Sequence, residues 1–122
     1  MAVDLNIDVY NELVDEDDPD FAPGIARQWL SQAYECLPEF DKLLAEGRWK
    51  ELAEKGHFLK GSAAFVGADK AKALCEEIQV WEKLIRPGQS PDAFFRPRIN
   101  RLPKIISDYS AALEKNSQAS GL

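Results

Sequence analysis

The sequence has little of what metal sites and disulfide frameworks require. Among its 122 residues there are one histidine and two cysteines, Cys36 and Cys75. This set cannot supply the four ligands of a structural zinc site. Both cysteines lie within helix-like patterns, so we expect reduced, buried thiols and no disulfide. No metal site is predicted in this chain.

Basic residues and long apolar runs are also scarce. There are 15 Lys and Arg against 21 Asp and Glu, a net charge of −6, whereas nucleic-acid binding needs clustered bases. The bases near residues 96–104 fit a solvated helix face better. No apolar run approaches the ~20 residues of a membrane span, and the N-terminus does not resemble a secretory signal. We expect one globular domain over residues 1–122, with no nucleic-acid or membrane partner.

The sequence has no Gly-rich phosphate loop, so we expect no ATP binding and no kinase or ATPase activity of its own. The acidic run at residues 15–20 superficially suggests a calcium loop. It lacks the glycine at the sixth position and the glutamate at the twelfth that such a loop needs. Calcium binding is therefore not expected.

Helical periodicity, in contrast, runs through most of the chain. Four substantial amphipathic segments with short connections predict an all-α fold, an antiparallel up-down-up-down four-helix bundle with an additional short N-terminal helix that caps or flanks it. We expect the tail at residues 117–122 to be disordered. The expected helices cover about residues 6–14, 19–45, 48–66, 69–86 and a last region that ends near residue 116.

Prolines and acidic residues give the expected helix boundaries. Asp18 is predicted to cap the second helix, with Pro19 in its first position. Pro38 lies inside that helix, so a kink or a local break is expected there. Pro97 and Pro103 suggest that the last region starts irregularly, with regular helix from about Pro103.

The third segment carries the histidine. At about 100° per residue, His57 projects from the edge of an apolar stripe. Phe58 and Phe65 form a second apolar surface, which predicts a second neighbouring helix. The stripe itself consists of Trp49, Leu52, Gly56, Leu59, Ala63 and Val66.

His57 has two informative neighbours on the same helix face, Lys60 at i+3 and Gly61 at i+4. At neutral pH much of an imidazole is the free-base nucleophile, and attack on a phosphoryl group needs in-line access and charge neutralisation. Lys60 can neutralise phosphate oxygens, and Gly61 leaves room for a second protein's active site. A lone helical histidine usually has no such task, so the argument depends on the combination.

Residues 57–62, His-Phe-Leu-Lys-Gly-Ser, followed by Gly67 and Ala68, resemble the signature of histidine-containing phosphotransfer (HPt) domains. Further similarity lies at residues 18–21, at Ile25, Gln28 and Gln32, and at residues 75–79. These segments resemble the free-standing, Ypd1-like fungal form of the family. The resemblance covers about residues 5–86.

The resemblance implies an exposed histidine that accepts phosphate from a receiver-domain aspartate and passes it to a response-regulator receiver. His57 would be phosphorylated, Lys60 would stabilise the phosphate, and Gly61 would give clearance. Gln79 would hydrogen-bond or orient the imidazole. Ser62 would have a structural role behind these groups.

The same resemblance implies an apolar docking surface with an acidic rim that includes Asp15, Asp17 and Asp18. For Ile7, Val14 and Ile25 an equally good interpretation is that they pack the first helix onto the bundle. The docking residues implied are Ile7, Asn11, Val14, Asp15, Phe21, Ile25, Gln28, Gln32, Ala64 and Glu76.

The implied partners are the receiver domain of a hybrid sensor histidine kinase and the receiver domains of response regulators. We expect a monomer in the cytoplasm, of a size that could also enter the nucleus, and no cofactor of its own, with Mg²⁺ supplied by the receiver. The alternative function is a non-catalytic helical adaptor that binds receivers without accepting phosphate. The intact His57 and Lys60 argue against that alternative.

Overall fold

The computed structural model describes residues 4–120, and none of them lies in a β-strand. No helix within these residues is long and apolar enough to cross a membrane. The elements are α1 (Ile7–Asn11), α2 (Phe21–Ala45), α3 (Trp49–Phe65), α4 (Asp69–Gln79), α5 (Trp81–Leu84) and α6 (Pro91–Ser120).

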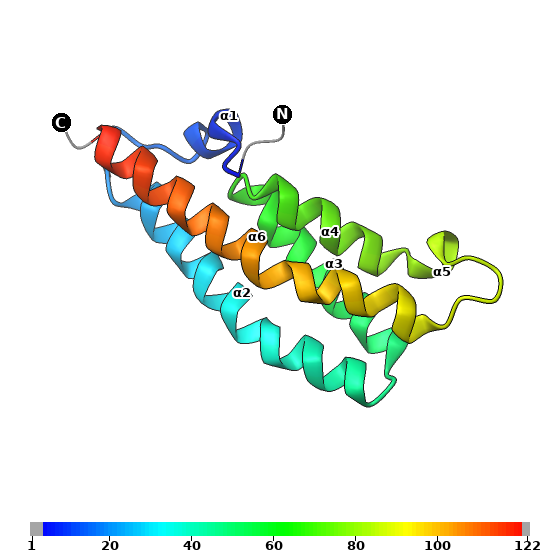
Figure 1. The fold of residues 1–122 in the computed structure, drawn as a ribbon. Coiled ribbons are helices and arrows are strands. Elements are labelled where there is room, and N and C mark those ends of the chain that lie inside the picture. The colour runs from blue at the N-terminus through cyan, green and yellow to red at the C-terminus, as the bar shows by residue number, and fades with distance from the viewer. Residues whose placement is uncertain (1–3, 121–122) are drawn as a thin grey trace.

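Helices α2, α3, α4 and α6 form an antiparallel bundle (Figure 1). Helix α3 packs against α2 and α4, and α6 packs against the same two helices, so each long helix has two neighbours. Helix α1 lies at the end of the bundle where α6 ends. The predicted all-α bundle with a short flanking N-terminal helix is confirmed.

The core consists of one face of each long helix. The stripe predicted for α3 is buried except at Trp49, which is half-buried, and Leu52, Leu59 and Ala63 have no exposed surface. Trp49 stacks on Phe95 of α6, with ring centroids 5.6 Å apart. Cys36 and Cys75 are buried and free, as predicted.

The first two helices begin or end differently from the prediction. Helix α1 ends at Asn11, before the predicted end at residue 14. Helix α2 begins at Phe21, two residues late, and Asp20 holds the N-cap position. Asp18 instead accepts the Phe21 backbone N–H through its carbonyl. The proline in the first turn is Pro23, where a helix leaves the backbone N–H groups unpaired in any case.

The internal prolines disturb the helices less than expected. Helix α2 continues through Pro38, so the predicted local break is wrong. Helix α6 is one helix from Pro91 and contains both Pro97 and Pro103, so its irregular start is also wrong. All three internal prolines are exposed, which places their rings on the solvent side, away from the core.

Two further boundaries also differ. The predicted helix at 69–86 is divided at Val80 into α4 and α5. The change of direction accompanies the packing of Trp81 on Phe95, with centroids 5.3 Å apart. Helix α6 continues to Ser120, four residues past the predicted end. The predicted disorder of the tail at residues 117–122 stays a prediction, and residues 121–122 lie outside the described residues.

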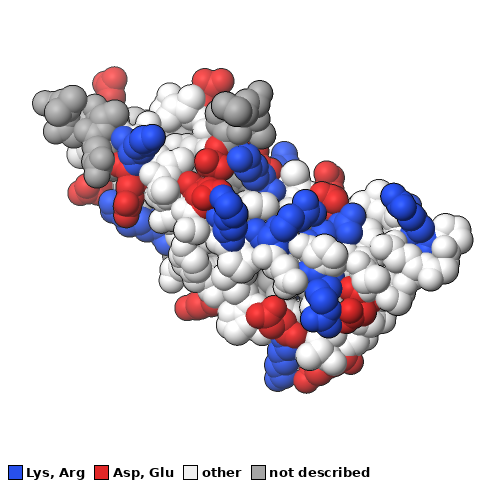
Figure 2. All heavy atoms as spheres, viewed as in Figure 1, with Lys and Arg blue, Asp and Glu red and all other residues white. Residues whose placement is uncertain are grey.

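Lys and Arg side chains gather over α6 and α4 among acidic ones (Figure 2). The cluster at residues 96–104 is largely neutralised within the chain. This arrangement fits the predicted solvated helix face better than a phosphate-binding surface. The ion pairs join Arg96 to Asp92, Arg98 to Glu77 and Lys104 to Asp108.

Candidate functional site

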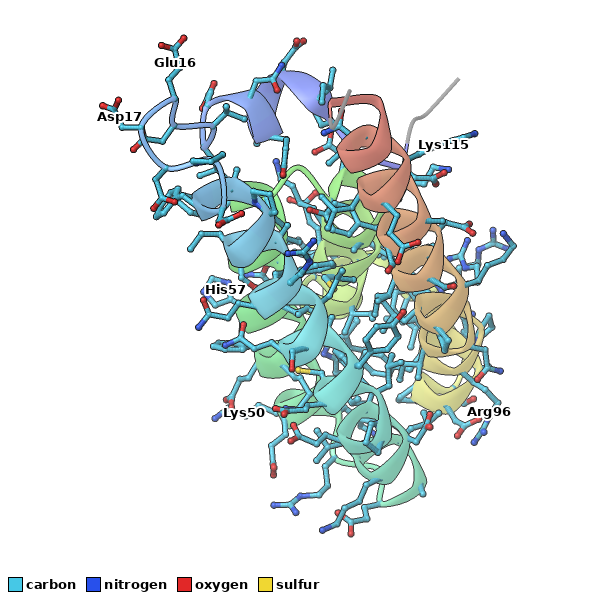
Figure 3. All side chains as sticks on the ribbon, turned by 90° about the vertical axis from the view of Figure 1, so that its left-hand side faces the viewer. Glu16, Asp17, Lys50, His57, Arg96 and Lys115 are labelled. Carbon is cyan, nitrogen blue, oxygen red and sulfur yellow. The ribbon has the colours of Figure 1, made fainter. Side chains whose placement is uncertain are left out.

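His57 lies in the middle of α3 and projects into solvent (Figure 3). It lines a shallow hollow of about 350 Å³ together with Lys50, Ala53, Glu54 and Gln79. The hollow lies over the contact between α3 and α4, the element that ends at Gln79. The imidazole is therefore accessible from outside while one side of it faces α4.

Lys60 lies one helical turn beyond His57 and is 25% exposed. Its ammonium nitrogen is 3.8 Å from a carboxylate oxygen of Glu76 on α4. At that distance the two groups form an ion pair but are too far apart for a direct hydrogen bond. The Lys60 charge is thus held near the histidine and is available to an incoming anion.

The two glycines near His57 have opposite surroundings. A Cβ atom added to Gly56 would lie 2.9 Å from the carbonyl oxygen of Cys75, so Gly56 is required for the close contact with α4. A Cβ atom added to Gly61 would meet nothing within 4 Å. The space beside Gly61 is open, as the clearance interpretation of the sequence predicts.

Gln79 and Ser62 are placed differently with respect to the histidine. The Gln79 side-chain oxygen is buried and has no hydrogen-bond partner among the described residues. Gln79 lines the same hollow as His57, so its side chain lies at the site although this oxygen has no exposed surface. The Ser62 hydroxyl donates to the Leu59 carbonyl at 3.1 Å, so it is engaged within its own helix.

The cysteines are poor nucleophiles in this fold. Burial, and then the neighbouring Cys36, raise the pKa of the Cys75 thiol to about 12. The pKa of Cys36 is also raised, first by burial. Both thiols are therefore protonated at neutral pH, and the thiolate is the reactive form. His57 has no competitor from these two groups.

An exposed apolar surface extends over α1, the connection after it, α2 and α3. Ile7, Val14 and Phe21 are each more than 40% exposed, so Ile7 and Val14 are not buried against the bundle, and their docking role stays a prediction. Ile25 is half-buried and packs against the core, so its contribution is mixed. A surface groove of about 490 Å³ runs between α2 and α3. It is lined by Ile25, Gln28, Trp29, Gln32, Gly61, Ser62, Phe65 and Val66.

The prediction that this helix contacts more than one neighbour is confirmed, since α3 packs against α2 and α4, but the two aromatic residues on which it was based belong to this exposed surface. Phe58 is 56% exposed and Phe65 is 59% exposed, so they do not face a second neighbouring helix. Both lie outside the buried stripe of α3. Their seven-residue spacing, with Gly61 and Ser62 between them, is the signal that could have identified an external surface.

The remaining implied docking residues lie around this surface. Asn11 and Asp15 are exposed, Ala64 is half-buried on α3, and Glu76 is exposed beside Lys60. In Figure 3 the acidic loop residues Glu16 and Asp17 lie along the same side of the molecule as His57. Within residues 4–120, no group of three or more His, Cys, Asp and Glu side chains could hold a metal ion.

The profile of the Hpt domain family matches residues 24–116, most of the chain. This chain belongs to the Hpt domain family. Membership confirms the resemblance that the residues around His57 suggested.

Curated relatives of this Hpt chain include phosphorelay proteins of three fungi. It is 34% identical over 109 residues to the phosphorelay intermediate protein YPD1 of Saccharomyces cerevisiae, covering 87% of the chain and 61% of that relative. It is 42% identical over 73 residues to YPD1 of Candida albicans, covering 58% and 40%. Multistep phosphorelay regulator 1 of Schizosaccharomyces pombe is 36% identical over 73 residues, covering 60% and 25%. The chain spans less than two thirds of each relative's length.

A solved structure shows the same fold. The crystal structure of yeast Ypd1p aligns with a TM-score of 0.84 and covers 97% of this chain and 96% of that one, at 20% sequence identity. At that identity the similarity establishes the Hpt-type helical bundle and nothing about partners.

Proposed function

We propose that this Hpt chain is a phosphorelay intermediate that carries a phosphoryl group on His57. The observation that carries the proposal is the open space at Gly61, one turn from an exposed histidine and beside the Lys60 ammonium. An imidazole in this position can be reached by a second protein. The curated relatives bear the names of phosphorelay proteins, which supports the same conclusion.

The donor in this proposal is the phospho-aspartate of a receiver domain. A ring nitrogen of neutral His57 attacks phosphorus with its lone pair, and a P–N bond forms. The bond from phosphorus to the aspartate oxygen breaks, and its electron pair leaves with the carboxylate. The other ring nitrogen keeps its proton, and Gln79, which lines the same hollow, would orient the ring. The reverse reaction places the phosphoryl group on a second receiver.

Most of the chemistry consists of positioning and charge neutralisation. Lys60 would neutralise the equatorial oxygens in place of its present partner Glu76. Mg²⁺ would come with the receiver and would add charge neutralisation from that side. The partners would be the receiver of a hybrid sensor histidine kinase and the receivers of response regulators, met in the cytoplasm.

The test is transfer from a phosphorylated receiver to the purified chain. The chain is expected to gain an acid-labile phosphate, and His57→Gln is expected to gain none. Equal labelling of the His57→Gln variant would refute the role of His57. Receiver binding without any transfer would support the alternative, a non-catalytic adaptor.

A further inference from the structure

Asn6, just before α1, is hydrogen-bonded to the turn between α3 and α4 and to the first residue of α4. Its backbone N–H donates to the Gly67 carbonyl at 2.8 Å. Its side-chain amide donates to an Asp69 carboxylate oxygen at 2.8 Å. Its side-chain oxygen accepts the Val9 backbone N–H at 3.2 Å and so caps α1. One side chain thereby joins the start of α1 to the start of α4.

Gly67 allows this close approach. It has a φ of +76°, and a Cβ atom there would lie 2.6 Å from the Asn6 carbonyl oxygen. An ion pair between Lys70 and Asp4, 2.8 Å long, flanks the same junction. The preceding carbonyl, that of Val66, accepts the Tyr109 hydroxyl at 2.8 Å. The end of α3 is thus fixed to both α1 and α6.

Helix α1 depends on this junction for its position. It has five residues, of which only Tyr10 is buried. An isolated helix of that length is unstable in water. The amide–carboxylate bond between Asn6 and Asp69 is charge-assisted and half-buried, conditions that strengthen a hydrogen bond.

The position of α1 matters because of the exposed side chains that it and the following turn present. Ile7 is 41% exposed and Val14 is 51% exposed. Both belong to the exposed apolar surface that also includes Phe65, on the helix that carries His57. Gly67 follows His57 by ten residues, and the part of α3 between them, which ends at Phe65, is about 12 Å long. The junction therefore sets where this part of the surface lies relative to the nucleophile.

We propose that Asn6 and Asp69 are positioning residues that hold α1 in register with His57 for receiver docking. The inference rests on the proposed function, since it takes a receiver domain as the partner. Loss of the bond should weaken receiver binding and leave the chemical reactivity of His57 unchanged. Neither residue belongs to the site residues implied by the family resemblance.

The decisive variant is Asn6→Asp, which keeps an acceptor for the Val9 N–H but places two carboxylates in contact. The matched control is the exchange Asn6→Asp with Asp69→Asn. The exchange has the composition and net charge of the natural chain and restores an amide–carboxylate bond in reverse. Receiver affinity is measured by titration, reactivity of His57 by labelling with the small donor phosphoramidate, and folding by thermal unfolding.

Asn6→Asp is expected to raise the receiver Kd about tenfold. Phosphoramidate labelling should stay within about twofold of the unchanged chain, because a small donor needs no docking surface. The exchange variant should return the Kd to within about twofold. A natural Kd in a folded Asn6→Asp variant would overturn the inference, as would an exchange that restores nothing. Because Kd is measured apart from transfer, the two proposals can fail separately. The role of Asn6 can be refuted while transfer to His57 stands, and transfer to His57 can be refuted while the role of Asn6 in binding stands.

Discussion

Helix α3 carries two glycines five residues apart, and they face different neighbours. Gly56 faces α4, where a side chain would collide with the Cys75 carbonyl and with Ile78. Gly61 faces open space on the same side as the exposed His57. The same residue type therefore serves the fold at one position and a partner at the other. We call these sides the α4 face, which contains Gly56, and the open face, which contains His57, Lys60, Gly61 and Phe65.

The comparison predicts that changes on the open face alter transfer or docking without destabilising the fold, whereas crowding on the α4 face lowers stability. A large effect on transfer is expected at Lys60. Lys60→Ala should lower the rate of transfer from a receiver by about 100-fold, because a charge that stabilises the transferring group is lost. Its stability should change by no more than about 0.5 kcal/mol.

Single-turnover transfer and urea unfolding measure these two effects of Lys60→Ala. Glu76→Gln is the matched control, because it breaks the same ion pair from the α4 side and keeps the ammonium group. Its transfer rate should stay close to that of the unchanged chain. If Glu76→Gln were as slow as Lys60→Ala, the ion pair and not the lysine charge would matter.

The glycine pair provides the next test. Gly56→Ala should lower the free energy of unfolding by about 1–2 kcal/mol, because crowding against α4 outweighs the gain in helix propensity. Gly61→Ala should raise it by up to about 1 kcal/mol, because only the gain in propensity applies. Urea unfolding of the two variants measures the difference. Equal changes in both would contradict the distinction between the two faces.

Phe65→Ala tests the docking role of the open face. The side chain is 59% exposed, so its removal should change stability by no more than about 0.5 kcal/mol. Because Phe65 is an aromatic residue that lines the groove, its removal should raise the receiver Kd about tenfold. Leu84→Ala, which removes another exposed apolar side chain, on α5, should leave the Kd unchanged. Equal effects of the two variants on Kd would remove Phe65 from the docking surface.

The smallest expected effect concerns the pH dependence of stability and Cys75, the α4 residue whose carbonyl oxygen faces Gly56. Burial raises the pKa of Cys75 to about 12, from 9.0 when exposed. The unfolded chain therefore loses this proton first, so the stabilisation is complete below pH 9 and declines above it. Cys75 alone should lower the free energy of unfolding by about 1 kcal/mol between pH 9 and pH 10. Cys75→Ala should lack that part of the slope in urea unfolding, and an unchanged slope would contradict the assignment.

Much of the bundle was predictable, because periodicity alone places the buried stripe of α3. The boundaries were not, because they depend on tertiary contacts. Val80 divides α4 from α5 where Trp81 packs on Phe95. The prolines of α6 are tolerated because they face solvent, a property that their identity does not reveal.

The nucleophile, its lysine and the glycine clearance were also predictable from spacing on one helix. The exposure of Phe58 and Phe65 was not, because an apolar residue outside the main stripe can face either a neighbouring helix or solvent. The junction at Asn6 was missed for a different reason. Its hydrogen bond to Asp69 spans 63 positions in the sequence, and no local pattern connects such distant residues.

The central claim is that a second protein occupies the open space at Gly61 during transfer. The most direct test is Gly61→Gln, labelled in parallel by a phosphorylated receiver and by phosphoramidate. We predict that transfer from the receiver falls by at least about 100-fold, while labelling by the small donor stays within about twofold and the fold is retained. Equal losses with both donors, or no loss with the receiver, would contradict the account.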